Sequence, residues 1–240
     1  YELLSLFTPM NILQKRLIAA GLSSVLAVAA VTQIIPQEGQ IVDNQGNHVA
    51  YIDMVGVATA CWGLKGKDMH GNRIVPGTKY TQQECETTLV KDLKKFNDTV
   101  NKAVTVEMKP YEEIAYTSLA WNIGTAAFSN STLVKQLNAG DREAACKGIL
   151  DWNRATFSSH GAKTQIKNGE KCTVKKDGNY SCTVRGLTNR RNHEFEVCEG
   201  RDAEVNAALK ELEALEKPSE AIKEWRSELP PAPVETNVPS

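Results

Sequence analysis

An uncharged apolar run at residues 17–35 is the feature that most constrains how this chain folds. Lys15 and Arg16 precede the run, and positive charge followed by an apolar segment is the order found in export signals, whose charges stay in the cytoplasm. As a helix rising ~1.5 Å per residue, the run would be about 28 Å long, close to the thickness of a bilayer's hydrocarbon core. The sequence therefore predicts that residues 10–35 form a hydrophobic segment that can enter a membrane.

Small and polar residues make this run only weakly lipophilic. Four interpretations stay open: a permanent anchor, a cleaved signal peptide with Ala27-Val28-Ala29 as the cleavage pattern, a temporary anchor that leaves the membrane, or a buried helix of a cytosolic protein. Residues 1–9 lack an initiator, so Met10 is the expected start and residues 1–9 are left out of the fold prediction.

The rest of the composition is that of an ordinary globular chain. Of its 240 residues, 41% are hydrophobic, which suits one domain or two small lobes. Lys and Arg number 28 and Asp and Glu 29, so the net charge of −1 gives no overall positive field and no nucleic-acid partner is expected. Three arginines are either a local basic patch or, as we prefer, a solvated helix face: Arg185, Arg190 and Arg191.

Six cysteines indicate disulfides rather than metal. An even number behind an export-type segment is typical of an oxidising compartment, and the Cys-x-x-Cys pairs of zinc sites do not occur in the sequence. Buried free thiols in a cytosolic protein are the alternative. The four histidines have no ligand spacing and are expected to be structural or exposed: His48, His70, His160 and His193. No metal site is therefore predicted.

Local patterns predict turns and strands first and helices later. Residues 43–47, Asp-Asn-Gln-Gly-Asn, predict a turn, and residues 48–61 are rich in strand-forming types. Residues 111–151 have a helical pattern. A polar Gly- and Lys-rich insertion at 155–185 is predicted to form a hairpin closed by a disulfide, and residues 187–198 are helical again.

A long helix is predicted between these regions, and a charged extension after them. Thr81 and Glu84 have the spacing of a capping box, so the helix should begin there and run to about Asn101. Residues 201–240 are predicted to be a charged helix followed by a Pro-rich disordered tail. The long helix should bury its apolar face: Leu89, Leu93, Phe96 and Val100.

Two acids and a threonine are candidates for sugar chemistry. Glycoside hydrolysis uses one protonated and one ionised carboxyl group on either side of the scissile bond. Glu38, close to Pro36 and the apolar run, is placed to be partly desolvated, which favours the protonated form of a carboxyl group. Asp53 is the candidate ionised partner and Thr59 a hydroxyl that can orient water. Asp43 is a rival acid, although its turn position explains it without catalysis.

Several segments in series resemble the phage lysozymes of glycoside hydrolase family 24. Residues 53–63, Asp-Met-Val-Gly-Val-Ala-Thr-Ala-Cys-Trp-Gly, resemble the family motif Asp-x-x-Gly-x-x-Thr-x-x-x-Gly, and residues 120–124, Ala-Trp-Asn-Ile-Gly, resemble its Phe-Asn-x-Gly motif. The resemblance covers residues 36–199, and the weakly hydrophobic N-terminus resembles that of signal-anchor-release endolysins. Further matching segments follow in the family's order: 66–68, 77–85, 91–93, 131–133, 137–146 and 186–198.

The resemblance implies an α+β lysozyme-like fold over residues 36–200, in which a long helix joins a small β-containing lobe to a larger helical lobe. It implies an endolysin that cuts peptidoglycan between N-acetylmuramic acid and N-acetylglucosamine without a cofactor. Glu38 would be the general acid, Asp53 would stabilise charge, and Thr59 would position water. Beside these roles, Trp121 and Asn122 are candidates to line the sugar cleft, and a place in the core is an equal alternative for Trp121.

The same resemblance implies where the protein acts. A monomer would be held at the periplasmic face of the host inner membrane by residues 17–35, and would then enter the periplasm, with peptidoglycan as its partner. The expected disulfides join the small lobe to the long helix, close the helical lobe, and staple the hairpin: Cys61–Cys85, Cys146–Cys198 and Cys172–Cys182.

Two departures from the family pattern concern the candidate site. Fifteen positions separate Glu38 from Asp53, more than in most family members, and the surplus is expected to form a longer loop around residues 43–47. Leu64 follows Gly63 where relatives often have histidine, so a structural histidine–carboxylate pair with Asp92 is expected to be missing.

Overall fold

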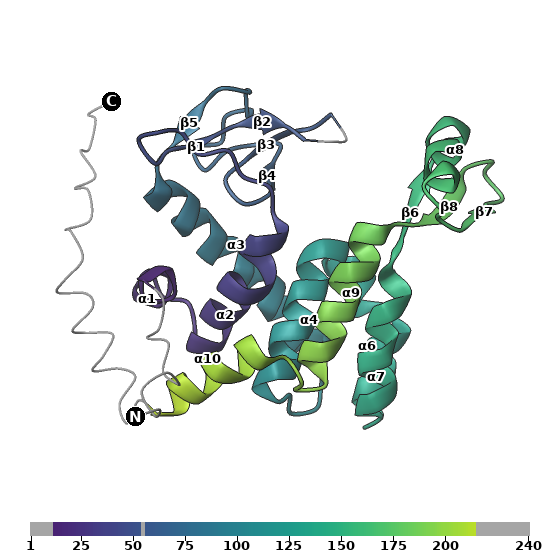
Figure 1. Cartoon of the computed structure of the whole chain (residues 1–240). Coiled ribbons are helices and arrows are strands. Elements are labelled where there is room, and N and C mark those ends of the chain that lie inside the picture. Colours follow the sequence, from purple (N-terminus) through teal and green to yellow (C-terminus); the bar gives the residue numbers. More distant parts are fainter. Residues whose placement is uncertain (1–11, 54–55, 215–240) are drawn as a thin grey trace, which may run out of the picture.

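The computed structural model describes residues 12–53 and 56–214, and it has the α+β lysozyme-like architecture expected from the sequence (Figure 1). A small lobe with short strands and a larger helical lobe are joined by the long helix α3 (Gln82–Ala103). The expectations for residues 1–9 and for the Pro-rich tail predicted within residues 201–240 fall on residues outside the described ranges.

The N-terminal apolar run is broken into short helices. Helix α1 spans Ile12–Ala19 and α2 spans Ser24–Ala29, followed by the π-helix η1 (Ala30–Ile34) and the 3-10 helix η2 (Ile35–Gln37). Gly21, at φ +95°, turns the chain between α1 and α2, and the Ser23 side chain caps α2 by accepting a hydrogen bond from the Leu26 N–H. Over 12–53 and 56–214, no helix combines the length and the apolar character that a membrane crossing requires.

Side chains of this run are buried inside the protein. Leu17, Ala30 and Ile34 are fully buried in the core of the small-lobe side, while Val28 and Ala29 are fully buried in the core of the helical lobe. The predicted segment 10–35 and the predicted domain 36–200 therefore share both cores. Burial of apolar area stabilises this arrangement by roughly 25 cal/mol per Å², so residues 17–34 are structural parts of the fold described here.

Two small antiparallel sheets make up the β-containing lobe. In the first, β1 pairs with β5; in the second, β3 lies between β2 and β4. The register of the second sheet places Thr59 opposite both Tyr51 and Lys65. The strands are short: β1 (His48–Val49), β2 (Tyr51–Ile52), β3 (Ala58–Ala60), β4 (Leu64–Lys65) and β5 (Lys79–Tyr80).

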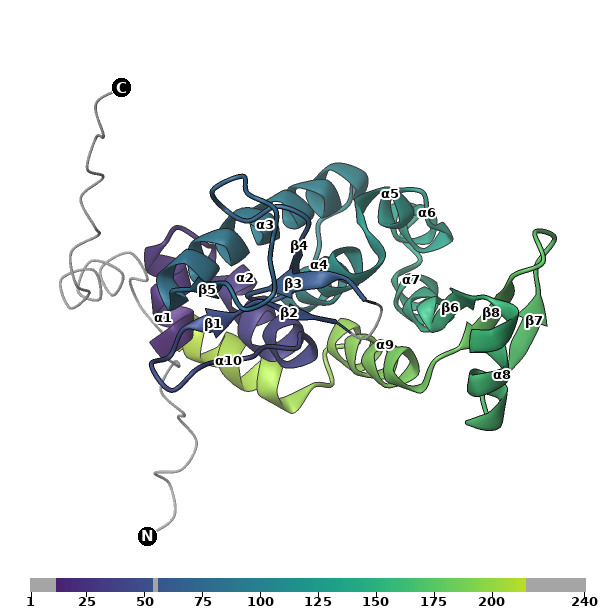
Figure 2. The same cartoon turned by 90° about the horizontal axis from the view of Figure 1, so that it is seen from above.

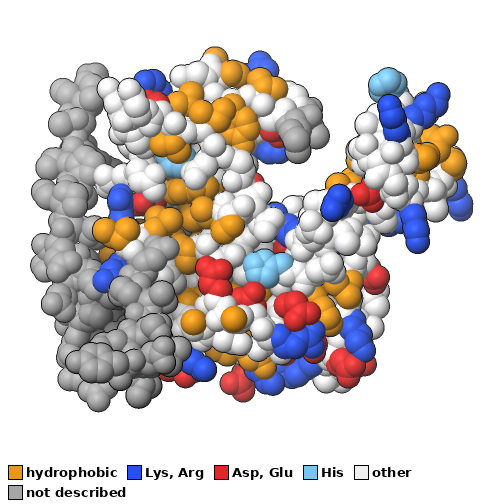
Figure 3. Space-filling model, viewed as in Figure 1, with side chains coloured by type: hydrophobic (Ala, Val, Ile, Leu, Met, Phe, Trp, Pro, Cys, Tyr) orange, Lys and Arg blue, Asp and Glu red, His pale blue; other side chains and the backbone are white. Residues whose placement is uncertain are grey.

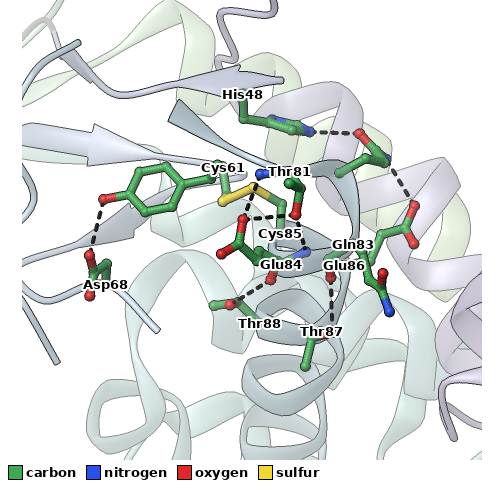
Figure 4. Close-up of a disulfide and its surroundings, with 12 residues drawn as sticks. His48, Cys61, Asp68, Thr81, Gln83, Glu84, Cys85, Glu86, Thr87 and Thr88 are labelled. Carbon is green, nitrogen blue, oxygen red and sulfur yellow. Dashed lines mark hydrogen bonds between the residues drawn. A yellow bond between two sulfur atoms is a disulfide. The ribbon is translucent and has the colours of Figure 1, made fainter. Parts of the chain in front are cut away.

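Helix α3 begins at the predicted capping box. The Glu84 N–H donates to Thr81 Oγ1 at 3.2 Å, and the Thr81 N–H donates to Glu84 Oε2 at 2.7 Å (Figure 4). Leu89, Leu93 and Val100 are buried as expected, whereas Phe96 is only partly buried. One face of α3 is thus fixed to the core.

The helical lobe is assembled around α4 (Pro110–Ile123), whose central residues are almost all buried. Helix α9 (Arg185–Cys198) packs along α4, and α10 (Ala203–Ala214) packs against both α2 and α4. The remaining helices are α5 (Thr125–Ser129), α6 (Thr132–Asn138), α7 (Arg142–Gly148) and the 3-10 helix η3 (Ile149–Trp152).

The predicted hairpin of the insertion is present, with one addition. Strands β6 (Arg154–Phe157), β8 (Tyr180–Thr183) and β7 (Cys172–Val174) form an antiparallel sheet in that order. Helix α8 (Ser159–Lys167), which the sequence analysis did not predict, packs on the sheet. The unit projects from the helical lobe in both views (Figures 1 and 2).

The structure contains the three predicted disulfides. Cys61–Cys85 ties the small lobe to the start of α3 (Figure 4), Cys146–Cys198 joins α7 to α9, and Cys172–Cys182 links neighbouring strands of the projecting sheet. The expectation that Cys61 lies on a strand was wrong. It follows β3 in a turn and has a φ of +50°.

Candidate active site

Glu38 lies where the N-terminal helices end. Its backbone N–H donates to the Ile35 carbonyl at 3.2 Å, which closes η2. Its side chain is 20% exposed, and Oε1 accepts a hydrogen bond from Trp121 Nε1 at 3.0 Å. Gly63 makes room for the carboxylate, because a Cβ atom at that position would lie 2.7 Å from Glu38 Oε2. Glu38 is therefore a half-buried acid held from one side.

Glu38 lies next to a network of buried, charged side chains on α9. Arg190 Nη1 lies 3.8 Å from Glu38 Oε1, and Arg190 Nε donates to Glu194 at 3.1 Å. Arg191 Nε lies 2.9 Å from Glu194 Oε2, while Glu194 Oε1, the oxygen that Arg190 contacts, also accepts a 2.7 Å hydrogen bond from the Ser118 hydroxyl. Burial lowers the pKa of Arg191 to about 10, so Arg191 stays charged at neutral pH.

The predicted solvated arginine face was wrong for two of its three residues. Arg190 and Arg191 are 6% and 0% exposed, and only Arg185 is exposed. Glu194 supplies the opposite charge that makes burial of both arginines tolerable. Sequence polarity could not reveal this, because a charged side chain buried with a partner looks the same in the sequence as a solvated one.

Asp53, Thr59 and Lys65 come together at the end of the second sheet. Asp53 Oδ1 accepts the Val57 N–H at 2.9 Å. The other oxygen, Oδ2, lies 3.4 Å from the Thr59 hydroxyl and 2.7 Å from Lys65 Nζ. Thr59 is 2% exposed, and Lys65 is the half-exposed member of the group. Lys65 was missed by the sequence analysis.

Tyr51 lies near both candidate acids. Its hydroxyl donates to the Gly39 carbonyl at 2.8 Å, next to Glu38 in the chain. Burial raises the pKa of Tyr51, and the negative charges of Glu38 and Asp53 raise it further. The two carboxylates, fifteen positions apart in the sequence, are thus both close enough to the Tyr51 hydroxyl to raise its pKa.

The surplus residues between the acids form the expected turn. Asp43 Oδ1 accepts the N–H groups of Gln45 and Asn47, both at 2.9 Å, and Asp43 Oδ2 lies 2.8 Å from Lys79 Nζ. The hydrogen bond from Lys79 holds the pKa of Asp43 well below its usual range. Asp43 is therefore an ionised turn residue and unsuited to the role of a general acid.

An open cleft of about 510 Å³ lies beside Glu38. Trp121 and Asn122 both line it, and Trp121 is partly buried. Asp53 and Thr59 are not among its lining residues; they connect to it through Lys65, which lines the cleft and pairs with Asp53. The full lining is Glu38, Trp62, Gly63, Leu64, Lys65, Asp92, Lys95, Phe96, Trp121 and Asn122.

Leu64 stands where relatives often have histidine, and Asp92 lies in the same cleft. Both residues line the cleft, and burial raises the pKa of Asp92. Among residues 12–53 and 56–214, no cluster of three His, Cys, Asp or Glu side chains has the arrangement of a metal site. The chemistry available in the cleft is that of carboxylates, an indole N–H and cationic side chains.

The fold and this cleft together define a lysozyme-like α+β protein. The phage lysozyme family model matches residues 44–194, and the chain belongs to the phage lysozyme family. The SAR-endolysin of Enterobacteria phage P21 is 33% identical over 143 residues, covering 60% of this chain and 83% of that protein. The SAR-endolysin of Bacteriophage PS119 is 37% identical over 105 residues, but the match covers 44% of this chain and only 60% of that protein.

A solved structure is also similar. The endolysin from Escherichia coli O157:H7 phage FAHEc1 matches with a TM-score of 0.54 and 28% sequence identity. The match covers 71% of this chain and 90% of that one, so the likeness extends over most of the lysozyme-like fold.

Proposed function

We propose that this protein is an endolysin that hydrolyses the bond between N-acetylmuramic acid and N-acetylglucosamine in bacterial peptidoglycan. The observation that carries the proposal is the position of Glu38, half-buried at the cleft and oriented by Trp121. Membership of the phage lysozyme family and the similarity to SAR-endolysins support it.

In this mechanism Glu38 protonates the glycosidic oxygen. The Trp121 N–H occupies Oε1, which leaves Oε2, the oxygen beside Gly63, to carry the proton. Asp53 stabilises positive charge on the sugar or helps to activate water, and Thr59 orients that water on the opposite ring face. Two carboxyl groups about 6.5–9.5 Å apart leave room for a water molecule and give inversion of configuration.

Reducing-end analysis of digested peptidoglycan tests the reaction. The purified protein should release fragments whose new reducing sugar is muramic acid, and Glu38→Gln should release none. A glucosamine reducing end would contradict the proposed bond, and an anhydro end would contradict hydrolysis. Absence of any product from the wild type would favour a wall-binding protein with a degenerate site.

We further propose that residues 17–35 anchor the chain in the host inner membrane, facing the periplasm, before they take up the buried position described above. While this run lies in lipid, Glu38, three residues after Ile35, is held at the membrane surface away from Trp121. Release would let the run fill both cores and bring Glu38 to the cleft. The name SAR-endolysin carried by the relatives supports this sequence of events.

A more lipophilic run tests the release step. Ala27 and Ala29 are fully buried, so their replacement would also disturb the fold. Ala19 is partly buried and Ala20 is exposed, so the double variant Ala19→Leu/Ala20→Leu should keep the folded core. After membrane depolarisation the wild type should leave the membrane fraction while the variant stays and delays lysis. Identical partitioning and lysis timing would contradict the proposal.

A further inference from the structure

Residues 154–184 form the projecting unit of β6, α8, β7 and β8, which we call the basic module. Resting on the proposed function, we propose that the basic module binds the carboxylates of peptidoglycan's peptide stems and so holds the glycan strand at the cleft. The module's positive charge, its few internal ion pairs, its disulfide-linked base and its position next to α9 all favour such binding.

The charge of the module differs sharply from that of the rest of the chain. It has two acids, Glu170 and Asp177, and six basic residues, which gives a net charge of +4. Because the whole chain carries −1, everything outside the module carries −5. A positive surface on an otherwise negative protein attracts and orients an anionic polymer. The basic residues, all exposed, are Arg154, Lys163, Lys167, Lys171, Lys175 and Lys176.

Most of this charge is uncompensated. Lys175 lies 3.7 Å from Asp177, and it is the one lysine of the module that forms an ion pair in the described part of the chain. Lys163 and Lys167 are four residues apart on α8, where like charges destabilise a helix. Such an arrangement lowers the stability of the fold. The lysines are therefore better explained by the binding of an anionic partner than by a contribution to folding.

The module presents these charges on a rigid base. The disulfide Cys172–Cys182 crosses β7 and β8, and Ala162 of α8 is 1% exposed against the sheet. Arg154 is used internally: its side chain donates to Ser181 and to the Lys171 carbonyl. The five lysines surround this base: Lys163 and Lys167 lie on α8, and Lys171, Lys175 and Lys176 lie in the residues that flank β7.

The position of the module connects it to the candidate active site. Helix α9 starts at Arg185, directly after the module, and within its first two turns reaches Arg190, which lies 3.8 Å from Glu38. The surface is deeply hollowed between the small lobe and the module, and basic side chains cover the module (Figure 3). A polymer that runs from the cleft through this hollow would meet those charges.

The position of the module favours the peptidoglycan polymer over membrane lipid as the anionic ligand that the module binds. Helix α1, the first helix of the proposed membrane run, lies at the end of the molecule opposite the module in both orientations (Figures 1 and 2). Peptide stems carry free carboxylates along the strand on which the cleft is proposed to act, so one ligand can reach both places. Anionic lipid is the alternative that the test must distinguish.

Binding to purified sacculi tests the proposal without requiring turnover. In a Glu38→Gln background, Lys163, Lys167, Lys171 and Lys176 are changed together to Gln. Co-sedimentation should show at least a tenfold loss of affinity for intact sacculi, and the wild-type lysine set should lose affinity as salt rises. The matched control changes four exposed lysines elsewhere to Gln, with the same loss of charge, and should bind nearly as well as the parent: Lys91, Lys102, Lys135 and Lys210.

Two further substrates identify the ligand. Sacculi whose free carboxylates have been converted to amides with a carbodiimide and ammonia keep their cross-links, and they should bind the parent as weakly as they bind the module variant. Equal binding of the parent to intact and amidated sacculi would overturn the proposal, as would equal losses in the module and control variants. A loss confined to anionic phospholipid vesicles would overturn it in favour of a membrane contact. Failure of the proposed hydrolysis is scored separately, by the reducing-end analysis on protein with Glu38 intact.

Discussion

Lys65 Nζ lies 2.7 Å from Asp53 Oδ2, and this pair joins the second sheet to the cleft that Glu38 lines. The pair depends on strand register rather than on closeness in the sequence: Thr59 lies opposite Lys65 on β4, and its hydroxyl approaches the same Asp53 oxygen. A half-exposed cation at this point holds the Asp53 carboxylate in a defined orientation.

Replacement of Lys65 should therefore lower activity more than stability. Lys65→Met keeps a chain of similar length but removes the cation, and we expect the hydrolysis rate to fall about tenfold, a ~1.4 kcal/mol effect on the barrier. Thermal unfolding should change little, because Lys65 is half exposed. Lys65→Arg should recover most of the rate. Full activity of Lys65→Met would show that Lys65 has no role in hydrolysis.

Trp121 offers a test of how Glu38 is oriented. Trp121→Phe removes the N–H that donates to Glu38 Oε1 at 3.0 Å but keeps an aromatic ring against Phe96, whose centroid lies 5.1 Å away. The turnover rate should drop about 10- to 100-fold, while the free energy of unfolding changes by about 1 kcal/mol. Trp152→Phe, outside the cleft, is the control and should leave turnover unchanged. An equal loss in both variants would indicate a packing effect.

Asp43 gives a prediction for stability against pH. Because Lys79 lowers the folded-state pKa of Asp43, its ionised form stabilises the fold above the unfolded value of about 3.9, and this contribution is lost as pH falls below that value. Asp43→Asn should melt below the wild type at pH 7, and the difference should shrink between about pH 4 and pH 2. Lytic activity at pH 7 should be retained; its loss in a folded variant would make Asp43 the catalytic acid.

Helix α10 should stabilise the buried N-terminal run. Val205 is 1% exposed in the helical-lobe core, and α10 packs directly on α2. Val205→Ala should lower the free energy of unfolding by about 1–3 kcal/mol and speed proteolysis of residues 12–35. The exposed Glu213→Ala, on the same helix, should have almost no effect. Unchanged proteolysis in Val205→Ala would mean that α10 does not protect the run.

Local chemistry made parts of this structure predictable. The capping box at Thr81 and Glu84 is complete within four residues, so the start of α3 follows from the sequence alone. The turn at Asp43 and the hairpin around Cys172–Cys182 are also local, and both are present. Trp121 and Asn122 were candidates from the sequence, and both line the cleft; their role in binding sugar stays a prediction.

Features set by tertiary contact were not predictable in this way. The apolar sequence of residues 17–35 suits a lipid bilayer and a protein core equally well. The break at Gly21 and the burial of the run in two cores could therefore be seen only in the folded structure. Arg190 lies 3.8 Å from Glu38 because the fold brings together the end of η2 and α9, which are far apart in the sequence. Lys65 reaches Asp53 through the pairing of β3 with β4, which the sequence does not specify.

The central claim is that Glu38 supplies the proton for glycosidic cleavage, and its most direct test is the rate at which Glu38→Gln hydrolyses purified peptidoglycan. Glutamine keeps the size of the side chain and an oxygen able to accept the Trp121 hydrogen bond but cannot donate an acidic proton, so we predict a loss of at least about 10²-fold in a normally folded protein. Glu113→Gln, on α4 and not among the cleft-lining residues, is the matched control. A Glu38→Gln protein that degrades peptidoglycan at the control's rate would contradict the account.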